Sequence, residues 1–429
     1  MGFGLAVRLG GSMKLCIHRG SHQIGGSCVE LESQGKRLLL DLGLPLEAEE
    51  NTADLLPAIP GLQEAGADLL GVVVSHPHMD HYGLLKHVRP DLPVAMGAAG
   101  RRILEAAQPW IPDSTVPAPG PVLESFRTLP WGPFQITPYL VDHSAYDSYA
   151  FLIEADGDRV FYSGDFRAHG RKGKLFTAMV EHPPENLKVL LMEGSSLGRL
   201  DLGTTFETES DLEERLAAEF RATEGLALVY ASSQNIDRMV TVFRAAKKTG
   251  RRLVVDLYTA LMLEATGNEN IPQSSWPQVA LYVPQRQRVQ IKKNQLFALL
   301  DRHKANRIYE QELAAKAAES VLMFRPLHRK DLERAGALQG ARMFYSMWDG
   351  YLKEEYGSRI RDWADSHQIP FLQMHTSGHA GPADLQRFAK ALNPKVLAPI
   401  HSFQPERYQE FFPRVVLWPD GEWWDLKAL

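Results

Sequence analysis

The run SHPHMDHYG at residues 75–83 holds the side chains of this sequence that are best suited to chemistry. His76, His78, Asp80 and His81 lie within it and follow an apolar stretch at residues 69–74. That stretch predicts a short strand buried on both faces, which would deliver the residues after it to one spot. Imidazoles this close repel one another when charged, and together with carboxylates they are common metal ligands. The run therefore predicts a metal site rather than a polar loop with scattered histidines.

Three further residues of metal-ligand type lie near the ends of other apolar runs. His143 lies in VDHSAYDS, Asp165 in VFYSGDF and His401 in APIHSF. Each is weak evidence alone, because an aspartate in Ser-Gly-Asp is usually a turn residue and a histidine after a strand is usually structural. Their joint occurrence with the first run favours one composite metal centre.

Short strands in the first half of the chain must position these residues. Strands are predicted at 14–18, 27–32, 37–41, 71–75, 149–154 and 159–162, with a helix near 82–88. Later strands at 226–231, 252–257, 321–324 and 342–345 alternate with helices at 236–248 and 310–319, which is typical of a parallel, doubly wound sheet. Metal-type residues return after about residue 360, with a helix at 383–392, so the doubly wound segment is predicted to be an insertion. The terminal VVLWPDGEWWDL predicts an aromatic hairpin.

The composition agrees with an ordinary soluble enzyme. The chain has 429 residues, of which 44% are hydrophobic, enough for a large core and two domains. A formal net charge of −5 gives no overall positive field, so a polyanion would need a local groove or a metal. Two cysteines exclude a disulfide framework and a thiolate zinc finger. The lack of a membrane-length apolar run or a secretory signal predicts a cytoplasmic protein with no membrane partner.

The order of these motifs resembles that of the metallo-β-lactamase-fold hydrolases. Asp41 in LLLDLG resembles the first motif, the run at 75–83 the second, His143 the third and Asp165 the fourth. The inserted α/β segment, followed by HTSGHA and PIHS, is similar to the β-CASP nucleases, a group that includes RNase J, the pre-mRNA 3′-end cleavage factor and Artemis-type DNases. The chain stops soon after PIHS, without the further C-terminal domain expected of RNase J, and its GSHQIGGS loop differs from that group.

The resemblance implies an α/β fold in which a metallo-β-lactamase αββα sandwich carries an inserted doubly wound β-CASP domain. The expected divisions are an extension at 1–12, the sandwich at 13–205 and 359–429, and the insertion at 206–358. Two divalent metal ions are implied, with Zn²⁺ favoured and Mn²⁺ as the alternative. One ion would be held by His76, His78 and His143, the other by Asp80, His81 and His401, with Asp165 bridging them. Asp41 would orient a ligating histidine rather than bind metal.

The same resemblance implies a catalytic role for a histidine and a glutamate near the insertion. They are His379, in HTSGHA, and Glu193, in LMEGSSLG. An imidazolium paired with a carboxylate has a raised pKa and suits a general acid for the leaving 3′-oxygen. His375 is the competing acid, and we interpret it as structural because it lies within a strand run. The catalytic set is then Asp80, Asp165, Glu193 and His379.

The insertion is expected to bind substrate. Ser232 and Ser233 follow a strand and suit the N-terminus of the next helix, where free N–H groups attract phosphate; Arg238 lies one turn further on. Ser346 lies near Trp348 in FYSMWDGY, where an aromatic ring could stack on a base. Ser377 completes this set. A plain helix cap and core packing of Trp348 are the alternatives.

The predicted function is that of a metal-dependent nuclease that hydrolyses phosphodiester bonds of single-stranded RNA through a two-metal-activated hydroxide. The histidine at 401 is the choice typical of RNA-directed members of the resembled group. A DNA-directed nuclease, a small-molecule metallo-hydrolase and a non-catalytic binding subunit are the alternatives. A homodimer or a role as a complex subunit stays open, as does internal against 5′-exonucleolytic cleavage.

Overall fold

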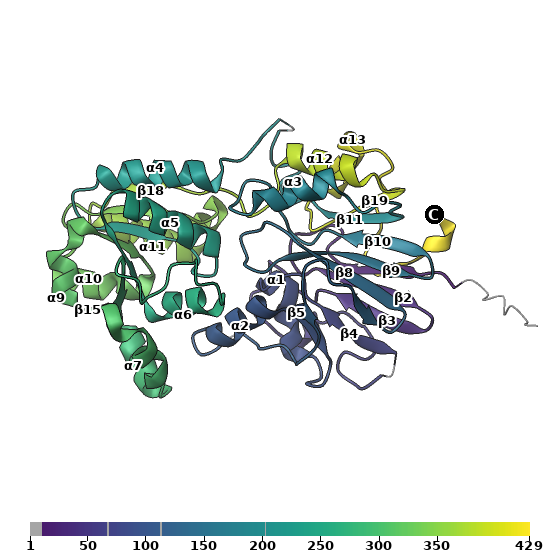
Figure 1. The fold of residues 1–429 in the computed structure, drawn as a ribbon, viewed down its shortest axis with the longest axis horizontal. Helices are drawn as coiled ribbons and strands as arrows, with labels where there is room; N and C mark the ends of the chain where they lie inside the picture. Colours follow the sequence, from purple (N-terminus) through teal and green to yellow (C-terminus); the bar gives the residue numbers. More distant parts are fainter. Residues whose placement is uncertain (1–10, 67, 112–113, 202) are drawn as a thin grey trace, which may run out of the picture.

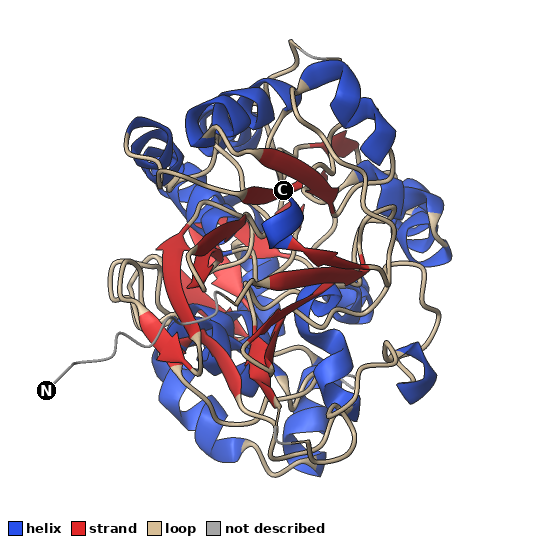
Figure 2. Ribbon diagram, turned by 90° about the vertical axis from the view of Figure 1, so that its right-hand side faces the viewer, coloured by secondary structure: helices blue, strands red, loops and turns tan. Residues whose placement is uncertain are grey.

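The computed structural model describes residues 11–66, 68–111, 114–201 and 203–429 (Figure 1). The predicted extension at 1–12 lies almost entirely outside the described residues. Within them, the strands form three sheets. Two sheets stack as a sandwich, and the third belongs to a separate lobe beside it (Figures 1 and 2).

The sandwich consists of one mixed sheet packed on another. The first sheet has the order β20-β1-β2-β3-β4-β5-β6. Its strands are β1 (Lys14–Arg19), β2 (Cys28–Ser33), β3 (Lys36–Leu40), β4 (Leu69–Val73), β5 (Val94–Gly97), β6 (Val122–Leu123) and β20 (Trp423–Asp425). The second has the order β19-β11-β10-β9-β8-β7. Its strands are β7 (Leu129–Trp131), β8 (Phe134–Leu140), β9 (Tyr149–Ala155), β10 (Asp158–Tyr162), β11 (Val189–Glu193) and β19 (Val396–Ile400).

Helices cover both outer faces of the sandwich, which makes it an αββα arrangement. Alternate strand residues such as Leu38, Leu40, Phe151 and Ile153 form the core between the sheets. The outer face of the first sheet packs against α1 (Met79–Tyr82) and α2 (Ala98–Ala107). The outer face of the second sheet packs against α3 (Gly173–Glu181), α12 (Pro382–Leu392) and α13 (Tyr408–Phe411).

The third sheet is parallel throughout and has the order β15-β14-β13-β16-β12-β17-β18. Its strands are β12 (Ala227–Tyr230), β13 (Arg252–Val255), β14 (Val279–Tyr282), β15 (Arg307–Ile308), β16 (Ser320–Met323), β17 (Arg342–Tyr345) and β18 (Phe371–Gln373). The helices that accompany it are α4 (Glu209–Arg221), α5 (Ile236–Lys248), α6 (Leu257–Ala265), α7 (Gln285–Lys293), α8 (Phe297–His303), α9 (Glu310–Ala315), α10 (Arg329–Ala335) and α11 (Glu355–Ser366). We call the third sheet and these helices the inserted lobe.

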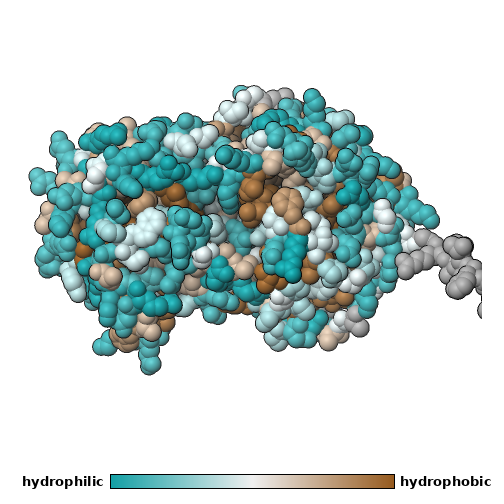
Figure 3. All heavy atoms as spheres, in the orientation of Figure 1, coloured by the Kyte–Doolittle hydropathy of each residue, from teal (hydrophilic) through white to brown (hydrophobic). Residues whose placement is uncertain are grey.

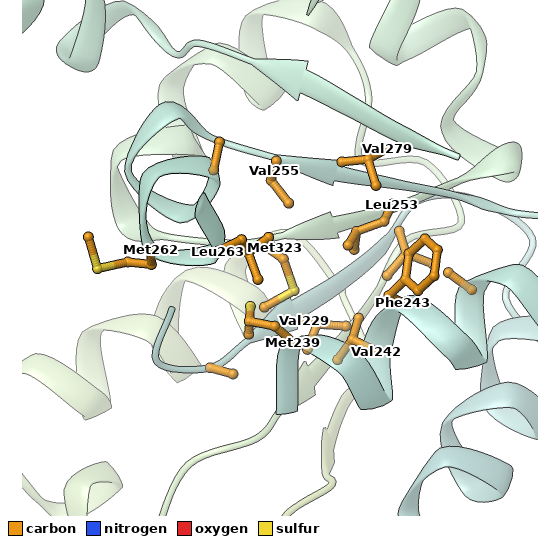
Figure 4. Packing of buried hydrophobic residues seen from close by; sticks show 14 of the residues in the cluster. Val229, Met239, Val242, Phe243, Leu253, Val255, Met262, Leu263, Val279 and Met323 are labelled. Atoms are coloured by element: carbon orange, nitrogen blue, oxygen red, sulfur yellow. The ribbon is translucent and has the colours of Figure 1, made fainter. Parts of the chain in front are cut away.

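Both faces of the third sheet are buried, as a doubly wound sheet requires. Val229 and Val255 point to a core formed with α4, α5 and α6 (Figure 4). Their neighbours Leu228 and Val254 point to a second core, formed with α9, α10 and α11. Continuous apolar strands are therefore explained by burial on two sides. The predicted fold class is confirmed.

The lobe is an insertion because the chain leaves the sandwich after β11 and returns to pair β19 directly with β11. β18 lies after residue 358, the predicted end of the insertion, and pairs with β17 in the third sheet. α2 of the sandwich packs on α6 of the lobe, where Arg102 donates to the backbone oxygens of Ala265 and Thr266, both at 2.9 Å.

Two predicted local structures are wrong. The C-terminal run does not form a hairpin, because β20 pairs with β1 while Val415 forms a bridge with Leu397 of β19. The predicted helix at 310–319 ends early, as α9, and continues as a short 3₁₀ turn. The face shown in Figure 3 is largely hydrophilic. None of the helices in the described part of the chain has the length and apolar character needed to cross a membrane.

Candidate metal centre

The predicted metal-type residues meet at one end of the sandwich. β10, β11 and β19 run parallel, so Asp165, Glu193 and His401, which end or follow these strands, share one edge. Residues 76–81 follow β4 of the other sheet, and His143 lies between β8 and β9. Strands that are neighbours in space but distant in sequence thus bring these side chains together.

Backbone contacts hold the short helix α1, which carries Asp80 and His81. The N–H of Leu42 donates to the backbone oxygen of His81 at 2.9 Å. Gly43 allows a close approach, because a Cβ at this position would lie 1.7 Å from the backbone oxygen of Asp80. The LLLDLG run therefore shapes the site through its backbone as well as through Asp41.

Asp165 lies at the centre of the cluster. Its Oδ2 is within 4.0 Å of five imidazole nitrogens: His81 Nε2 at 3.1 Å, His401 Nε2 at 3.6 Å, His76 Nε2 at 3.7 Å, His379 Nδ1 at 3.8 Å and His143 Nε2 at 4.0 Å. Burial raises the pKa of this carboxyl group, but the imidazoles around it prevail and hold the pKa well below its usual value. Asp165 is therefore a carboxylate at neutral pH.

The ligand-type atoms fall into groups with the geometry to hold cations. One group contains His76, His78 and His143; a second contains Asp80, His81, Asp165 and His401; within each, the atoms lie within 4.8 Å of one another. A third, overlapping group joins His143, Asp165 and His379. The first two coincide with the two ligand sets implied by the sequence, while ligation itself stays a prediction.

The chemistry of these side chains fits a divalent metal. Burial lowers the pKa of His76, His78, His143 and His401, so their imidazoles are neutral at physiological pH and can act as ligands. Nε2 of His76, Nε2 of His401 and Oδ1 of Asp165 are buried without a hydrogen-bond partner among the described residues. Buried polar atoms are rarely left unpaired, and these three all belong to residues of the cluster. The site is compatible with divalent cation binding.

Asp41 lies behind the cluster rather than in it. Its fully buried carboxylate accepts hydrogen bonds from Nδ1 of His81 at 2.8 Å and from the hydroxyls of Ser75 and Tyr162, each at 2.7 Å. The backbone N–H of Ser75 donates to it as well, at 2.7 Å. This arrangement holds the His81 ring with Nε2 directed at Asp165, which supports the predicted orienting role.

His379 lies beside the cluster with Glu193 behind it. Nδ1 of His379 is 3.3 Å from Oε2 of Glu193, and the Ser195 hydroxyl bridges them, at 2.6 Å from Glu193 and 3.0 Å from His379. Burial lowers the pKa of His379, but the Glu193 carboxylate prevails and raises it to about 9. The side chain is 28% exposed, so a protonated imidazole is presented at the open side of the site. The sequence reasoning missed Ser195, although it lies in the LMEGSSLG motif.

A second residue missed from the sequence is Arg167, two positions after Asp165. Its fully buried guanidinium pairs with Asp142 at 3.1 Å and with Asp237 of the inserted lobe at 2.6 Å. It also donates to the backbone oxygen of Ser377 at 3.0 Å, two residues before His379. Arg167 therefore links the sandwich, the lobe and the loop that carries His379.

The prediction that Arg238 contacts substrate is wrong. Its guanidinium is fully buried and pairs with Glu209 at 3.0 Å. It also donates to the backbone oxygens of Ser346, at 3.1 Å, and Thr376, at 3.2 Å. Nη1 lies 3.4 Å from Nδ1 of His375, whose pKa is lowered to about 3 by burial and by this neighbouring charge. His375 is therefore neutral, in agreement with its structural interpretation.

Two of the predicted substrate-binding serines, Ser233 and Ser346, are buried inside the lobe. Ser346 is buried, and its hydroxyl donates to the backbone oxygen of Met374. Ser233 is also buried, with its hydroxyl 2.8 Å from that of Thr259. Ser232 and Ser233 do not form the predicted helix cap, because the N-cap of α5 is Asn235. The hydroxyls of Ser233 and Ser346 are used inside the lobe rather than presented to a ligand.

Two of the predicted serines keep some exposure. Ser232 is exposed, and its hydroxyl accepts from the N–H of Gln234 at 3.3 Å. Ser377 is half-buried, and its hydroxyl accepts from the N–H of His379 at 3.0 Å. Ser377 therefore lies next to the cluster, and its part in substrate binding stays a prediction.

Comparisons with known proteins find similar sequences and a similar fold. Residues 23–201 match the model of the metallo-β-lactamase superfamily. Ribonuclease J of Helicobacter pylori (strain 26695) is 23% identical over 256 residues, covering 57% of this chain and 36% of that protein. Ribonuclease J of Mycobacterium tuberculosis (strain H37Rv) is 25% identical over 253 residues, covering 57% of this chain and 44% of that protein. The chain therefore spans less than half the length of these curated relatives.

A solved structure matches almost the whole chain. A protein of unknown function from Enterococcus faecalis V583 superposes with a TM-score of 0.76 at 20% identity, covering 96% of this chain and 100% of that one. The likeness shows that the combination of sandwich and inserted lobe occurs in another protein.

Proposed function

Since this chain carries a metallo-β-lactamase domain, as its sequence predicted, we propose that it is a metal-dependent nuclease of the β-CASP group acting on single-stranded RNA. The observation that carries the proposal is the convergence of five imidazoles on one carboxylate oxygen of Asp165, with one of the five paired to Glu193. Such a site combines cation ligands with a protonated imidazole, and hydrolysis of a phosphodiester uses both.

The proposed metal ligands are those of the two groups described above. One cation would be held by His76, His78 and His143, the second by Asp80, His81 and His401, with Asp165 shared between them. The ions, when bound, supply Lewis-acid neutralisation of the phosphoryl oxygens and activation of water. Imidazole and carboxylate ligands favour Zn²⁺, and the additional carboxylate of the second group also suits Mn²⁺.

His379 would donate the proton that the leaving 3′-oxygen requires. Its partial exposure leaves the ring accessible to a substrate, and the carboxylate of Glu193 keeps it protonated at neutral pH. Ser195 would hold the ring at a fixed angle between Glu193 and the substrate. The residues thus divide between cation binding and proton donation.

The substrate would enter between the sandwich and the inserted lobe, which extends past the predicted end of 206–358 to β18 (Phe371–Gln373). The two bodies meet at α2 and α6 and again at the buried pair Arg167–Asp237. These contacts hold the lobe beside the cluster. An opening between them would admit a single strand more readily than a duplex, and we expect basic side chains along it and binding that weakens with salt.

RNA is the favoured substrate for two reasons. The similar proteins from H. pylori and M. tuberculosis are called ribonuclease J. His401 in PIHS also has the residue type of RNA-directed members of the group that this sequence resembles. Its imidazole lies 3.6 Å from Asp165, where it can contribute to the second cation site.

The test is cleavage of four matched substrates by the metal-loaded protein: 5′-phosphorylated RNA, 5′-hydroxyl RNA, circular RNA and single-stranded DNA of equivalent sequence. Cleavage of RNA in preference to DNA is expected, and cleavage of the circle would show internal cutting. Preferential cleavage of DNA would replace the RNA assignment. Failure to cleave any of the four by protein of full metal content would refute the nuclease assignment.

A further inference from the structure

Two aromatic side chains of one loop in the inserted lobe are exposed and in contact. Trp348 follows β17, and Tyr351 lies in the 3₁₀ helix η6 (Asp349–Lys353). They are 39% and 36% exposed. Their ring centroids are 5.3 Å apart and the ring planes nearly perpendicular, at 84°. Paired aromatic rings on a surface form an apolar patch of the kind that commonly binds a ligand.

The aromatic pair is connected to His379 through Arg199 and Ser195. The guanidinium of Arg199 lies 5.0 Å from the ring centroid of Trp348. Nη1 of Arg199 also donates to the backbone oxygen of Ser195 at 3.3 Å, and the Ser195 hydroxyl is 3.0 Å from Nδ1 of His379. Trp348 is thus connected to the proposed proton donor through Arg199 and Ser195, which places this loop of the inserted lobe next to the cluster.

The position of the indole depends on Gly350. A Cβ at this residue would lie 2.2 Å from Cη2 of Trp348, so any side chain would displace the ring. Because Gly350 has no side chain, the indole lies against the backbone of its own loop. This contact orders the ring before a ligand arrives, which lowers the entropy cost of binding.

We propose that Trp348, Tyr351 and Arg199 form a stacking site for one unpaired nucleobase of the substrate, next to the scissile phosphate. This proposal rests on the proposed nuclease function and adds a residue-level contact to it. Aromatic rings stack on any base, because every base has a π face, and a guanidinium can bind the adjoining phosphate. A base held in a duplex cannot stack at such a site, so the stacking site, called the platform below, selects single strands.

The test measures KM and kcat of the metal-loaded protein on a single-stranded RNA and on variants with one abasic position each. Trp348→Leu removes the aromatic ring, Trp348→Phe keeps one, and Gly350→Val displaces the indole without removing it. Trp423→Leu is the matched control, because Trp423 is 43% exposed and lies on β20, an element that contributes nothing to the site. Thermal unfolding checks that each variant is folded.

We expect Trp348→Leu and Gly350→Val to raise KM about 10- to 100-fold, since stacking of one base on an aromatic ring is worth about 1–3 kcal/mol. Trp348→Phe should retain most of the affinity, and Trp423→Leu should match the unmodified protein. For the unmodified protein, one abasic position near the cut should raise KM as much as Trp348→Leu does. The same abasic position should cause no further rise in KM for Trp348→Leu.

Two results would overturn the platform. An unchanged KM in Trp348→Leu would refute the stacking site while leaving the nuclease function intact. The stacking site would also be refuted if the rise in KM caused by Trp348→Leu multiplied with the rise caused by every abasic position. If the unmodified protein cleaves neither RNA nor DNA, both the nuclease function and the platform are refuted. Failure of the platform alone can therefore be distinguished from failure of the nuclease function.

Discussion

Nδ1 of His143 donates a hydrogen bond to the backbone oxygen of Gly378 over 2.6 Å. The bond fixes the tautomer of His143, so its Nε2 presents a lone pair to the cluster, 3.3 Å from Nδ1 of His78. Gly378 precedes His379, so one hydrogen bond connects a proposed metal ligand with the loop of the proposed proton donor. The proposed metal binding and the proposed proton donation would therefore be structurally coupled.

The same loop is held by both the inserted lobe and the sandwich. The backbone oxygen of Thr376 accepts from Arg238 at 3.2 Å, and that of Ser377 accepts from Arg167 at 3.0 Å. Three consecutive carbonyl groups, from Thr376 to Gly378, are thus held by side chains of two different bodies. The position of His379 depends on how sandwich and lobe meet.

The first prediction concerns metal content. Metal analysis should give close to two transition ions per chain, and Asp165→Ala should lose at least one of them, with activity reduced by several orders of magnitude. His182→Ala is the matched control, because that histidine is exposed and lies outside the ligand groups. Full activity with a single tightly bound ion would contradict the dinuclear arrangement.

The second prediction separates proton donation from metal binding. His379→Gln should keep its metal content while kcat falls about 10²- to 10⁴-fold, the usual contribution of a general acid. A substrate with a good leaving group needs no proton from the enzyme, so its kcat should fall much less in this variant. Loss of metal from this variant would show that His379 is a ligand instead.

The third prediction concerns pH. In the proposed mechanism the acid form of His379 is the active one, and a pKa of about 9 keeps it populated until the pH rises through that value. Glu193→Gln removes the charge that raises this pKa, so the alkaline limb of the kcat profile should move to lower pH. The profile is measured at saturating substrate and metal. An unmoved limb would mean that another group is the acid.

The fourth prediction addresses the buried ion pairs. Arg167→Met removes the guanidinium that pairs with the buried carboxylates of Asp142 and Asp237, which should cost about 3–5 kcal/mol of unfolding free energy. Arg127→Met is the control, because Arg127 is 74% exposed in its pair with Glu124. Denaturant unfolding measures both. Equal unfolding free energies of the two variants would show that the buried ion pairs contribute little to stability.

The fifth prediction concerns the backbone under the cluster. Gly43→Ala would place Cβ 1.7 Å from the backbone oxygen of Asp80, so α1 must move and the ligands on it with it. Metal affinity should fall strongly even though no ligand is replaced. Gly203→Ala is the matched control, because a Cβ there meets nothing within 4 Å. Unchanged metal binding in Gly43→Ala would mean that α1 can adjust.

The local sequence determined most of the helices and strands and indicated which residues form the cluster. The helix at Ile236–Lys248 and the strand at Arg342–Tyr345 were predicted to the residue. The metal-type residues lie near the ends of apolar strands, and that pattern is visible along the chain because strand burial and a strand end are local properties. The spacing within residues 75–83 needed no tertiary information.

The partners of each polar side chain were decided only in three dimensions. Arg238 has the sequence context of a phosphate-binding residue, yet it is buried by contacts with Glu209, Ser346 and Thr376, which lie 29 to 138 positions away. The aromatic C-terminus has the turn residues of a hairpin, but β1 offers a free sheet edge to β20. A buried charge or an edge strand takes whichever partner the packed chain brings within reach, and long-range strand order, not local sequence, sets that distance.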